Sequence, residues 1–139
     1  MRNLTILILT TTIGLFLSCD KLGIESTENI YTKWEATMFI SIESMGYSKN
    51  KNYNPVIEFN TEGSYSLKLD MNQCSGSLSL AGENGIAISA AGCTKMCCDS
   101  KFSQKFTEML PRVKTFSIEG KILKLNIPDW GWIELIAVK

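Results

Sequence analysis

Cysteine is the most reactive residue type in this sequence, and its spacing limits the chemistry it can perform. The chain has five cysteines and no histidine. Apart from Cys19 near the N-terminus, they are Cys74, Cys93, Cys97 and Cys98, so that three of them lie within six positions. Thiolate zinc sites usually have two separated Cys-x-x-Cys pairs, and a redox-active dithiol usually has one such pair. We therefore predict that these four cysteines form structural disulfides and hold no metal. A four-thiolate metal site and a redox-active dithiol are the alternatives.

Four cysteines can pair in three ways. A bond between the neighbours Cys97 and Cys98 would require a strained ring, so the sequence argues against it. Two arrangements remain open: Cys74–Cys97 with Cys93–Cys98, or Cys74–Cys98 with Cys93–Cys97. Either one ties Cys74 to the cysteine-rich segment and closes a loop of roughly two dozen residues, which is typically worth about 3 kcal/mol.

The remaining polar residues do not form a catalytic pattern. Without histidine, a serine or cysteine nucleophile lacks its usual base. The acidic residues, such as Glu58, Glu62 and Asp70, mostly fall at polar strand positions and in turns, as expected of solvated surfaces. No phosphate-binding loop or dinucleotide motif is present. We expect a protein that is not an enzyme and has no cofactor.

The N-terminus has the layout of an export signal. Arg2 is followed by an uncharged apolar run from Leu4 to Leu17, which is short for a membrane span, and the run ends at Ser18-Cys19. This pattern is typical of a bacterial lipoprotein signal at residues 1–18, with Cys19 as the lipidation site. A plain signal peptide or a short anchor helix is the alternative. We expect attachment to the membrane through the lipid, with the protein at the outer membrane facing the periplasm.

The mature chain is expected to have a polar tether at 19–30 and one domain at 31–139. Removing residues 1–18 takes away Arg2, which leaves 13 Lys+Arg against 14 Asp+Glu. A nearly neutral domain offers no electrostatic basis for binding nucleic acid.

Short alternating segments dominate this domain. Residues 33–42 have Trp34, Ala36, Met38, Ile40 and Ile42 on one side, which predicts a half-buried strand. Further strands are expected at 56–59, 64–70, 77–81, 86–88, 113–118, 122–127 and 132–138. One helix is expected near 99–110, with Phe102, Phe106, Met109 and Leu110 as a core-facing stripe. The fold class is thus α+β, mostly β: a curved antiparallel sheet or barrel-like roll of about seven or eight strands with one packed helix.

Several of these residues resemble the signature of the META domain, also called HslJ-like. Trp34 matches its early tryptophan, Asn72 and Gly76 its Asn-x-x-x-Gly motif, and Thr94, Met96 and Cys98 its Thr-x-Met-x-Cys segment. The resemblance extends over residues 31–138 and implies a non-enzymatic envelope protein with a role in stress tolerance or envelope integrity. Met71 stands where the family often has a cysteine, so its disulfide cannot be copied here. The direction in which Cys74 points slightly favours Cys74–Cys97 with Cys93–Cys98.

The motif residues also have a physical interpretation. Asn72 and Gly76 suit a tight corner, because asparagine tolerates left-handed backbone angles and glycine adopts them freely. Thr94 can bond backbone groups of the turn into the helix.

Three aromatic residues are candidate contacts for a partner: Trp130 beside a turn, and Tyr47 and Tyr53 in or near a polar loop. Trp130 could instead cap one end of the core. The alternative function is therefore a binding module outside the cytoplasm, either a protease inhibitor or a small-ligand carrier.

Overall fold

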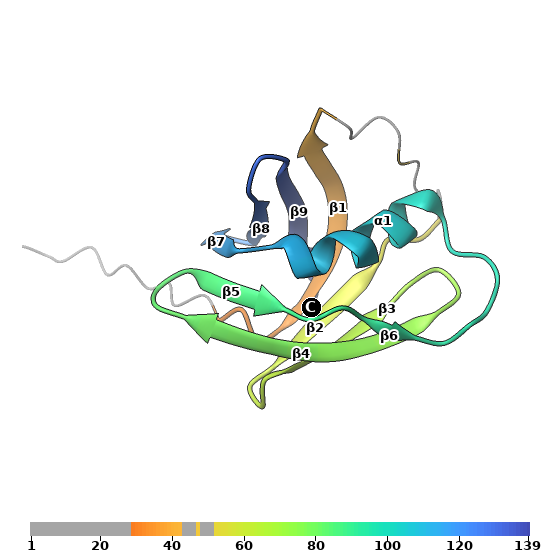
Figure 1. Cartoon of the computed structure of the whole chain (residues 1–139), viewed down its shortest axis with the longest axis horizontal. Coiled ribbons are helices and arrows are strands. Elements are labelled where there is room, and N and C mark those ends of the chain that lie inside the picture. Colours follow the sequence, from red (N-terminus) through yellow and green to blue (C-terminus); the bar gives the residue numbers. More distant parts are fainter. Residues whose placement is uncertain (1–28, 43–46, 48–51) are drawn as a thin grey trace, which may run out of the picture.

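A single curved sheet and one helix make up the described part of the protein (Figure 1). The computed structural model describes residues 29–42, 47 and 52–139. The strands are β1 (Lys33–Ser41), β2 (Val56–Asn60), β3 (Ser64–Lys68), β4 (Gln73–Ala81), β5 (Gly85–Ile88), β6 (Gly92–Cys93), β7 (Thr115–Glu119), β8 (Ile122–Ile127) and β9 (Gly131–Ala137). The helix α1 (Lys101–Met109) continues into the 3-10 turn η2 (Leu110–Arg112). No helix among these residues is long and apolar enough to cross a membrane.

The sheet is antiparallel and closes into an uneven ring. Its strand order is β3-β2-β1-β9-β8-β7-β5-β4-β6, and β3 also pairs with β4. The weak link lies between β5 and β7, whose register consists of the single pair Gly85 and Thr115. The predicted fold class is therefore confirmed. The described part has two strand features that were not expected: the two-residue β6, and a β4 that begins at Gln73 and not at position 77.

The first strand departs from its predicted alternation. Trp34 and Ala36 are buried as expected, but Met38 is 44% exposed and Ile42 is 99% exposed. The pairing of β1 with β9 shifts between Ala36 and Met38, which marks a β-bulge. Because a bulge inserts one residue, it exchanges the two faces of the strand, and Phe39 takes the buried place. The predicted inward positions after Ala36 were wrong for this reason.

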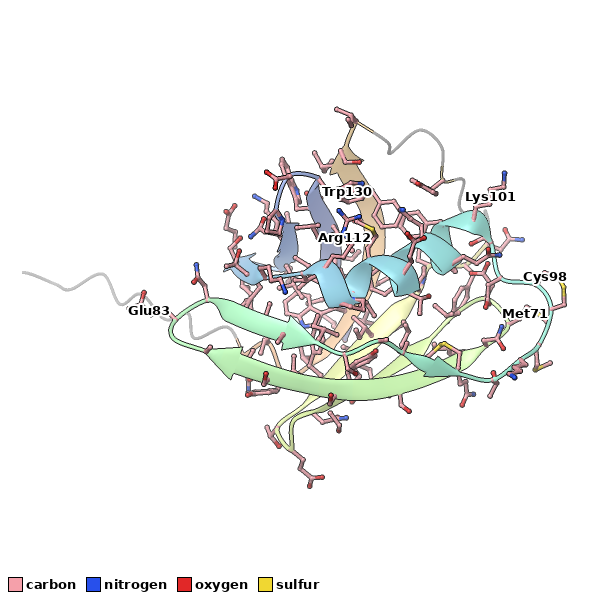
Figure 2. The ribbon with its side chains drawn as sticks, in the orientation of Figure 1. Met71, Glu83, Cys98, Lys101, Arg112 and Trp130 are labelled. Atoms are coloured by element: carbon pink, nitrogen blue, oxygen red, sulfur yellow. A yellow bond between two sulfur atoms is a disulfide. The ribbon has the colours of Figure 1, made fainter. Side chains whose placement is uncertain are left out.

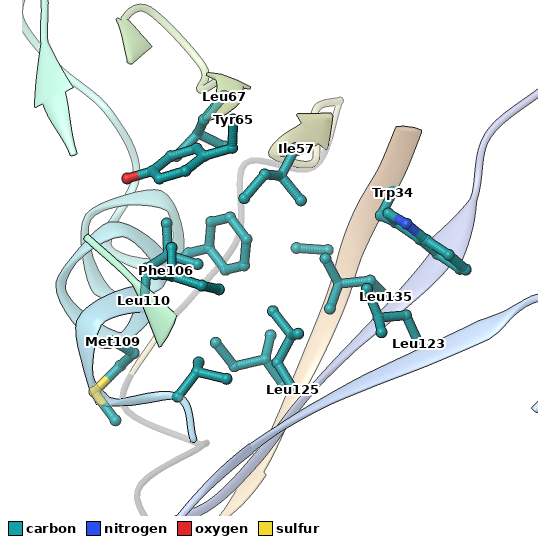
Figure 3. Close-up of a cluster of buried hydrophobic side chains, with 14 of the residues drawn as sticks. Trp34, Ile57, Tyr65, Leu67, Phe106, Met109, Leu110, Leu123, Leu125 and Leu135 are labelled. Atoms are coloured by element: carbon teal, nitrogen blue, oxygen red, sulfur yellow. The ribbon is translucent and has the colours of Figure 1, made fainter. Parts of the chain in front are cut away.

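The helix follows the predicted pattern. Ser100 is its N-cap, with the Oγ atom accepting a hydrogen bond from Ser103 N. Phe102, Phe106, Met109 and Leu110 are all buried, so the apolar stripe is core. Figure 3 shows the last three among side chains from the strands, with Ile57, Leu125 and Leu135 on the sheet side. The inside of the roll is therefore filled by packed apolar side chains.

The N-terminal predictions mostly lie outside the described residues. The predicted signal at 1–18 and the predicted lipidation site Cys19 both lie there. Of the expected tether, the structure describes Asn29 and Ile30. Ile30 is buried in the core, and its carbonyl oxygen accepts a hydrogen bond of 2.8 Å from Trp34 Nε1. The boundary expected after residue 30 was therefore wrong for Ile30, which belongs to the packed domain.

Candidate functional site

Three of the motif residues, Asn72, Thr94 and Met96, meet Asp99 at one end of the roll. We call this network of four residues the Asn72 clamp. The Asn72 side chain is buried and makes four hydrogen bonds there. Its Nδ2 donates to Met96 O at 2.8 Å and to Asp99 Oδ2 at 2.6 Å. Its Oδ1 accepts from Thr94 Oγ1 and from Met96 N, both at 2.8 Å. One amide side chain therefore fastens the start of β4 to the segment between β6 and α1.

Two carboxylates extend this network. Asp99 Oδ1 accepts from the backbone N–H groups of Met71 at 2.8 Å and of Asn72 at 3.2 Å. Asp70 accepts from Ser100 N at 2.6 Å and from Ser103 Oγ at 2.7 Å. Both carboxylates are thus engaged in holding the turn before β4 against the start of the helix.

The Asp70 carboxylate is held in its charged form. Burial alone would raise its pKa, but the hydrogen bonds from the Ser103 hydroxyl and from Ser100 outweigh that effect and lower the pKa below its ordinary value. A carboxyl with a lowered pKa is a poor general base at neutral pH. The arrangement therefore favours a structural role for Asp70.

The disulfide pairing differs from both predicted arrangements. Cys74 bonds to Cys93, which belongs to neither of the two predicted arrangements. Cys74 and Cys93 lie directly opposite each other in the pairing of β4 with β6, with Cα atoms 4.0 Å apart. The two-residue strand β6, which the sequence did not reveal, brings them together. Cys97 and Cys98 lie next to each other in the segment between β6 and α1.

The part of the corner interpretation that concerned backbone angles was also wrong. Among the described residues, Asp129 is the one non-glycine with a positive φ, and Gly76 is not among the glycines that have one. Gly76 lies inside β4, opposite Tyr65 of β3. A Cβ atom at this position would lie 2.6 Å from the Tyr65 ring and from Ser89 Oγ. Glycine is needed here so that the buried Tyr65 ring can pass close to the backbone and donate its hydroxyl to Ser89 O.

Two of the candidate contact residues pack around one core side chain. The ring of Phe39 meets Tyr47 edge-on at 5.8 Å and Trp130 edge-on at 5.7 Å, and it stacks on Phe102 at 4.4 Å. Trp130 is partly buried against the core, as the capping interpretation expects. Lys105 Nζ lies 5.1 Å from the centre of the Tyr47 ring. Both Tyr47 and Trp130 therefore have packing roles.

The third candidate, Tyr53, lies apart from this cluster, beside a groove on the outer face of the sheet. The groove, which we call the Tyr53 groove, has a volume of about 420 Å³ and is lined by Tyr53, Val56, Glu58, Ser66, Lys68 and Gln73, among others. Lys68 Nζ lies 5.9 Å from the centre of the Tyr53 ring, and Tyr53 Oη donates to Lys68 O at 3.2 Å. Burial, followed by the negative charges of Asp70, Glu35 and Asp99, raises the Tyr53 pKa, so the hydroxyl stays protonated.

Sequence reasoning found part of these arrangements. It identified Asn72 in one family motif and Thr94 and Met96 in another, but it missed Asp70 and Asp99 as hydrogen-bond acceptors. The signal for Asp99 was its place beside the helix N-cap, where a carboxylate often accepts backbone N–H groups. Among residues 29–42, 47 and 52–139, no three His, Cys, Asp or Glu side chains gather closely enough to hold a metal ion.

Comparison with known proteins agrees with the motif resemblance. The family model of the META domain matches residues 28–130. An NMR structure of a protein from Burkholderia xenovorans has a TM-score of 0.64 at 12% identity and covers 78% of this chain and 83% of its own. A crystal structure of a duf4847 family protein from Bacteroides vulgatus has a TM-score of 0.58 at 14% identity. The match covers 82% of this chain and 99% of that protein's chain.

Identities this low show a shared fold and nothing about activity. Among proteins with curated descriptions, none matches the sequence significantly. The META domain is not a known enzyme family. Because the family model spans most of the chain, including the stretch that holds Trp34, Asn72, Gly76, Thr94 and Met96, this protein belongs to the META domain family.

Proposed function

We propose that this protein is a lipid-anchored, non-enzymatic binding domain of the bacterial cell envelope, and that its partner binds in the Tyr53 groove. The observation that carries the proposal is the groove itself, with an aromatic ring, an apolar wall and charged side chains on the outer face of the sheet. Its volume of about 420 Å³ falls within the range of ligand sites in proteins. The inside of the roll is filled by the core, which favours an external site over an internal carrier pocket.

The chemistry of the groove suggests what it binds. Tyr53 and Val56 provide apolar surface, and Lys68 places a positive charge beside the Tyr53 ring. Lys33 is paired with Glu58 at 3.6 Å, so its charge is partly balanced. This combination suits a ligand with a flat apolar face next to a carboxylate or phosphate. A role in stress tolerance or envelope integrity, as the family resemblance implies, is compatible with such a binding module.

Lipid attachment at Cys19 is supported by the sequence. The positively charged start, the uncharged apolar run and the Ser18-Cys19 junction form the pattern of a lipoprotein signal. Substitution Cys19→Ser should leave unprocessed precursor and abolish labelling by a palmitate analogue. Cys98→Ser is the matched control and should keep the label. Normal labelling and membrane fractionation of the Cys19→Ser protein would refute the assignment.

The role of the Tyr53 groove is tested by complementation, in a bacterial strain from which the gene for this protein has been deleted. The wild-type protein should restore tolerance to an envelope stress, such as a detergent or a bulky antibiotic, and Tyr53→Ala and Lys68→Glu should not. The control is Lys121→Glu, which makes the same charge change in an exposed turn between β7 and β8. All three variants should reach the envelope in equal amounts, as measured by immunoblot. Full restoration by Tyr53→Ala and Lys68→Glu would exclude the groove as the site.

A further inference from the structure

The outer face of β3 and β4 is polar and regular. Tyr65, Leu67 and Cys74 point into the core, so the residues that alternate with them along the paired strands point outward. These outward residues are Ser64, Ser66, Lys68, Gln73, Ser75 and Ser77. Figure 2 shows the course of β4, from the end near Met71 to the end near Glu83. Serines predominate on this face, and a serine hydroxyl both donates and accepts hydrogen bonds.

A second hollow continues the Tyr53 groove along this face. It has a volume of about 370 Å³, and its lining includes Tyr31, Asn60, Glu62 and Ser64. Glu58 lines both hollows, so they adjoin at that residue. We call the two hollows together the β2–β3 cleft. From position 56 to position 60 the cleft follows β2 for about 14 Å, at the usual rise of an antiparallel strand. One tyrosine ring, Tyr53 or Tyr31, stands in the wall of each half.

The floor of the cleft determines which kind of ligand it suits. Both β2 and β3 have a neighbouring strand on each side, so an extended peptide cannot join the sheet here as a further strand. A purely apolar ligand would cover the serine hydroxyls without giving them hydrogen-bond partners, which costs free energy. A ligand rich in hydroxyl groups provides such partners. The two tyrosine rings offer flat apolar surfaces for the CH groups on the face of a sugar ring.

The charges in the cleft differ between its two ends. Lys68, at one end, forms no ion pair with a described residue, whereas Lys33 is paired with Glu58 at 3.6 Å. Glu62, in the turn after β2, likewise has no ion pair within the described part of the chain. A carboxylate accepts hydrogen bonds from hydroxyl groups and repels anions. The cleft therefore suits a ligand with one negative charge, at Lys68, and an uncharged hydroxylated part towards Glu62.

We propose that the β2–β3 cleft binds an oligosaccharide in which a sugar that carries a carboxylate adjoins an uncharged sugar. The carboxylate pairs with Lys68, the ring of the same sugar packs on Tyr53, and the uncharged sugar lies over Ser66 towards Tyr31. This inference rests on the proposed function, because the Tyr53 groove is one half of the cleft, and it names the class of ligand. Wall glycans and secreted acidic polysaccharides both contain such pairs of sugars.

Calorimetric titration with three tetrasaccharides tests the ligand class. The full-length protein is purified in a detergent without sugar groups. The first probe alternates a hexuronic acid with an N-acetylhexosamine, the second is a wall-glycan fragment whose carboxylate is the lactyl group of muramic acid, and the third is uncharged chitotetraose. One of the acidic probes should bind about tenfold or more tightly than chitotetraose, because its carboxylate forms a charge-assisted bond with Lys68. The acidic probe that binds more tightly identifies the source. Absence of binding, or equal binding of all three, would overturn the proposal.

Two variants with matched controls test the placement of the sugar. Lys68→Gln should abolish the preference for the acidic probe, and Lys121→Gln, in an exposed turn, should keep it. Ser66→Leu places a bulky side chain where the hollows adjoin and should weaken binding about tenfold or more. Ser79→Leu makes the same change at an exposed position of β4 outside the cleft and should bind normally. Circular dichroism checks that all four variants are folded. An unchanged preference in Lys68→Gln, or normal binding by Ser66→Leu, would refute the placement.

The complementation assay separates this inference from the proposed function. If the tetrasaccharides do not bind and Tyr53→Ala still fails to restore stress tolerance, the Tyr53 groove is a site for another class of ligand and the inference of a sugar is wrong. If Tyr53→Ala and Lys68→Glu restore tolerance fully, the proposed function itself fails.

Discussion

The Asn72 clamp makes a quantitative prediction about stability. Substitution Asn72→Ala removes four hydrogen bonds. The backbone N–H and C=O of Met96 and the Oδ2 atom of Asp99 lose this partner, while Asp99 Oδ1 keeps its bonds from the backbone N–H groups of residues 71 and 72. A hydrogen bond of this kind contributes about 0.5–1.5 kcal/mol net. Thr94 and Met96 are exposed, so water replaces part of what they lose. We therefore expect the free energy of unfolding to fall by about 2–4 kcal/mol, less than the sum of four full contributions.

Urea unfolding followed by tryptophan fluorescence measures this loss, and Asn72→Asp tests its cause. The aspartate has almost the same shape, but it places a second carboxylate where Nδ2 now lies 2.6 Å from Asp99 Oδ2. Two adjacent carboxylates raise one of the two pKa values. A raised folded-state pKa means that the protonated pair is favoured in the fold, so the loss in Asn72→Asp should shrink as the pH falls. A loss below about 1 kcal/mol in Asn72→Ala, or a pH-independent loss in Asn72→Asp, would refute the role of the clamp.

Other predictions concern the core and the acid response. Phe106 is fully buried, so Phe106→Ala should cost about 3–5 kcal/mol in urea unfolding, and a loss below about 1 kcal/mol would mean that the side chain is not core. Gly76→Ala should cost about 1–3 kcal/mol, because its methyl group meets the Tyr65 ring; an unchanged midpoint would contradict that contact. The lowered pKa of Asp70 stabilises the fold above the unfolded-state value of about 4, and this contribution is lost as the pH falls through the folded-state pKa. Asp70→Asn should therefore flatten the decline in stability between about pH 5 and 2, and an unaltered decline would show that Asp70 is not responsible.

The fold could be predicted because its signals are local. Alternation with a period of two marks most of the strands, and the stripe from Phe102 to Leu110 has the period of a helix. The start of β4 escaped notice because Gln73-Cys74-Ser75-Gly76 carries no apolar alternation. Its strand form comes from pairing with β3 on one side and β6 on the other.

The site residues depend on contacts between distant segments, which explains what was missed. The bulge in β1 follows from its register with β9, and no residue type in 33–42 indicates a bulge. The cysteine pairing depends on β6, whose two residues are too few to show a pattern. Gly76 was read as a turn former, although its reason is the Tyr65 ring of the next strand. Spacing alone could show that Asn72 and Thr94 matter, but not that they bond to each other.

The burial of Ile30 has a consequence for the proposed lipid attachment at Cys19. Ile30 is buried and its carbonyl is held by Trp34 Nε1, so the domain is anchored from that residue onward. Ile30 is the eleventh residue after Cys19. A chain of that length reaches at most about 35–40 Å when fully extended, and about 20 Å on average as a flexible coil. With the lipid on Cys19 as proposed, a partner would have to meet the domain within one or two domain diameters of the bilayer surface, which favours partners that are themselves in or on the same membrane.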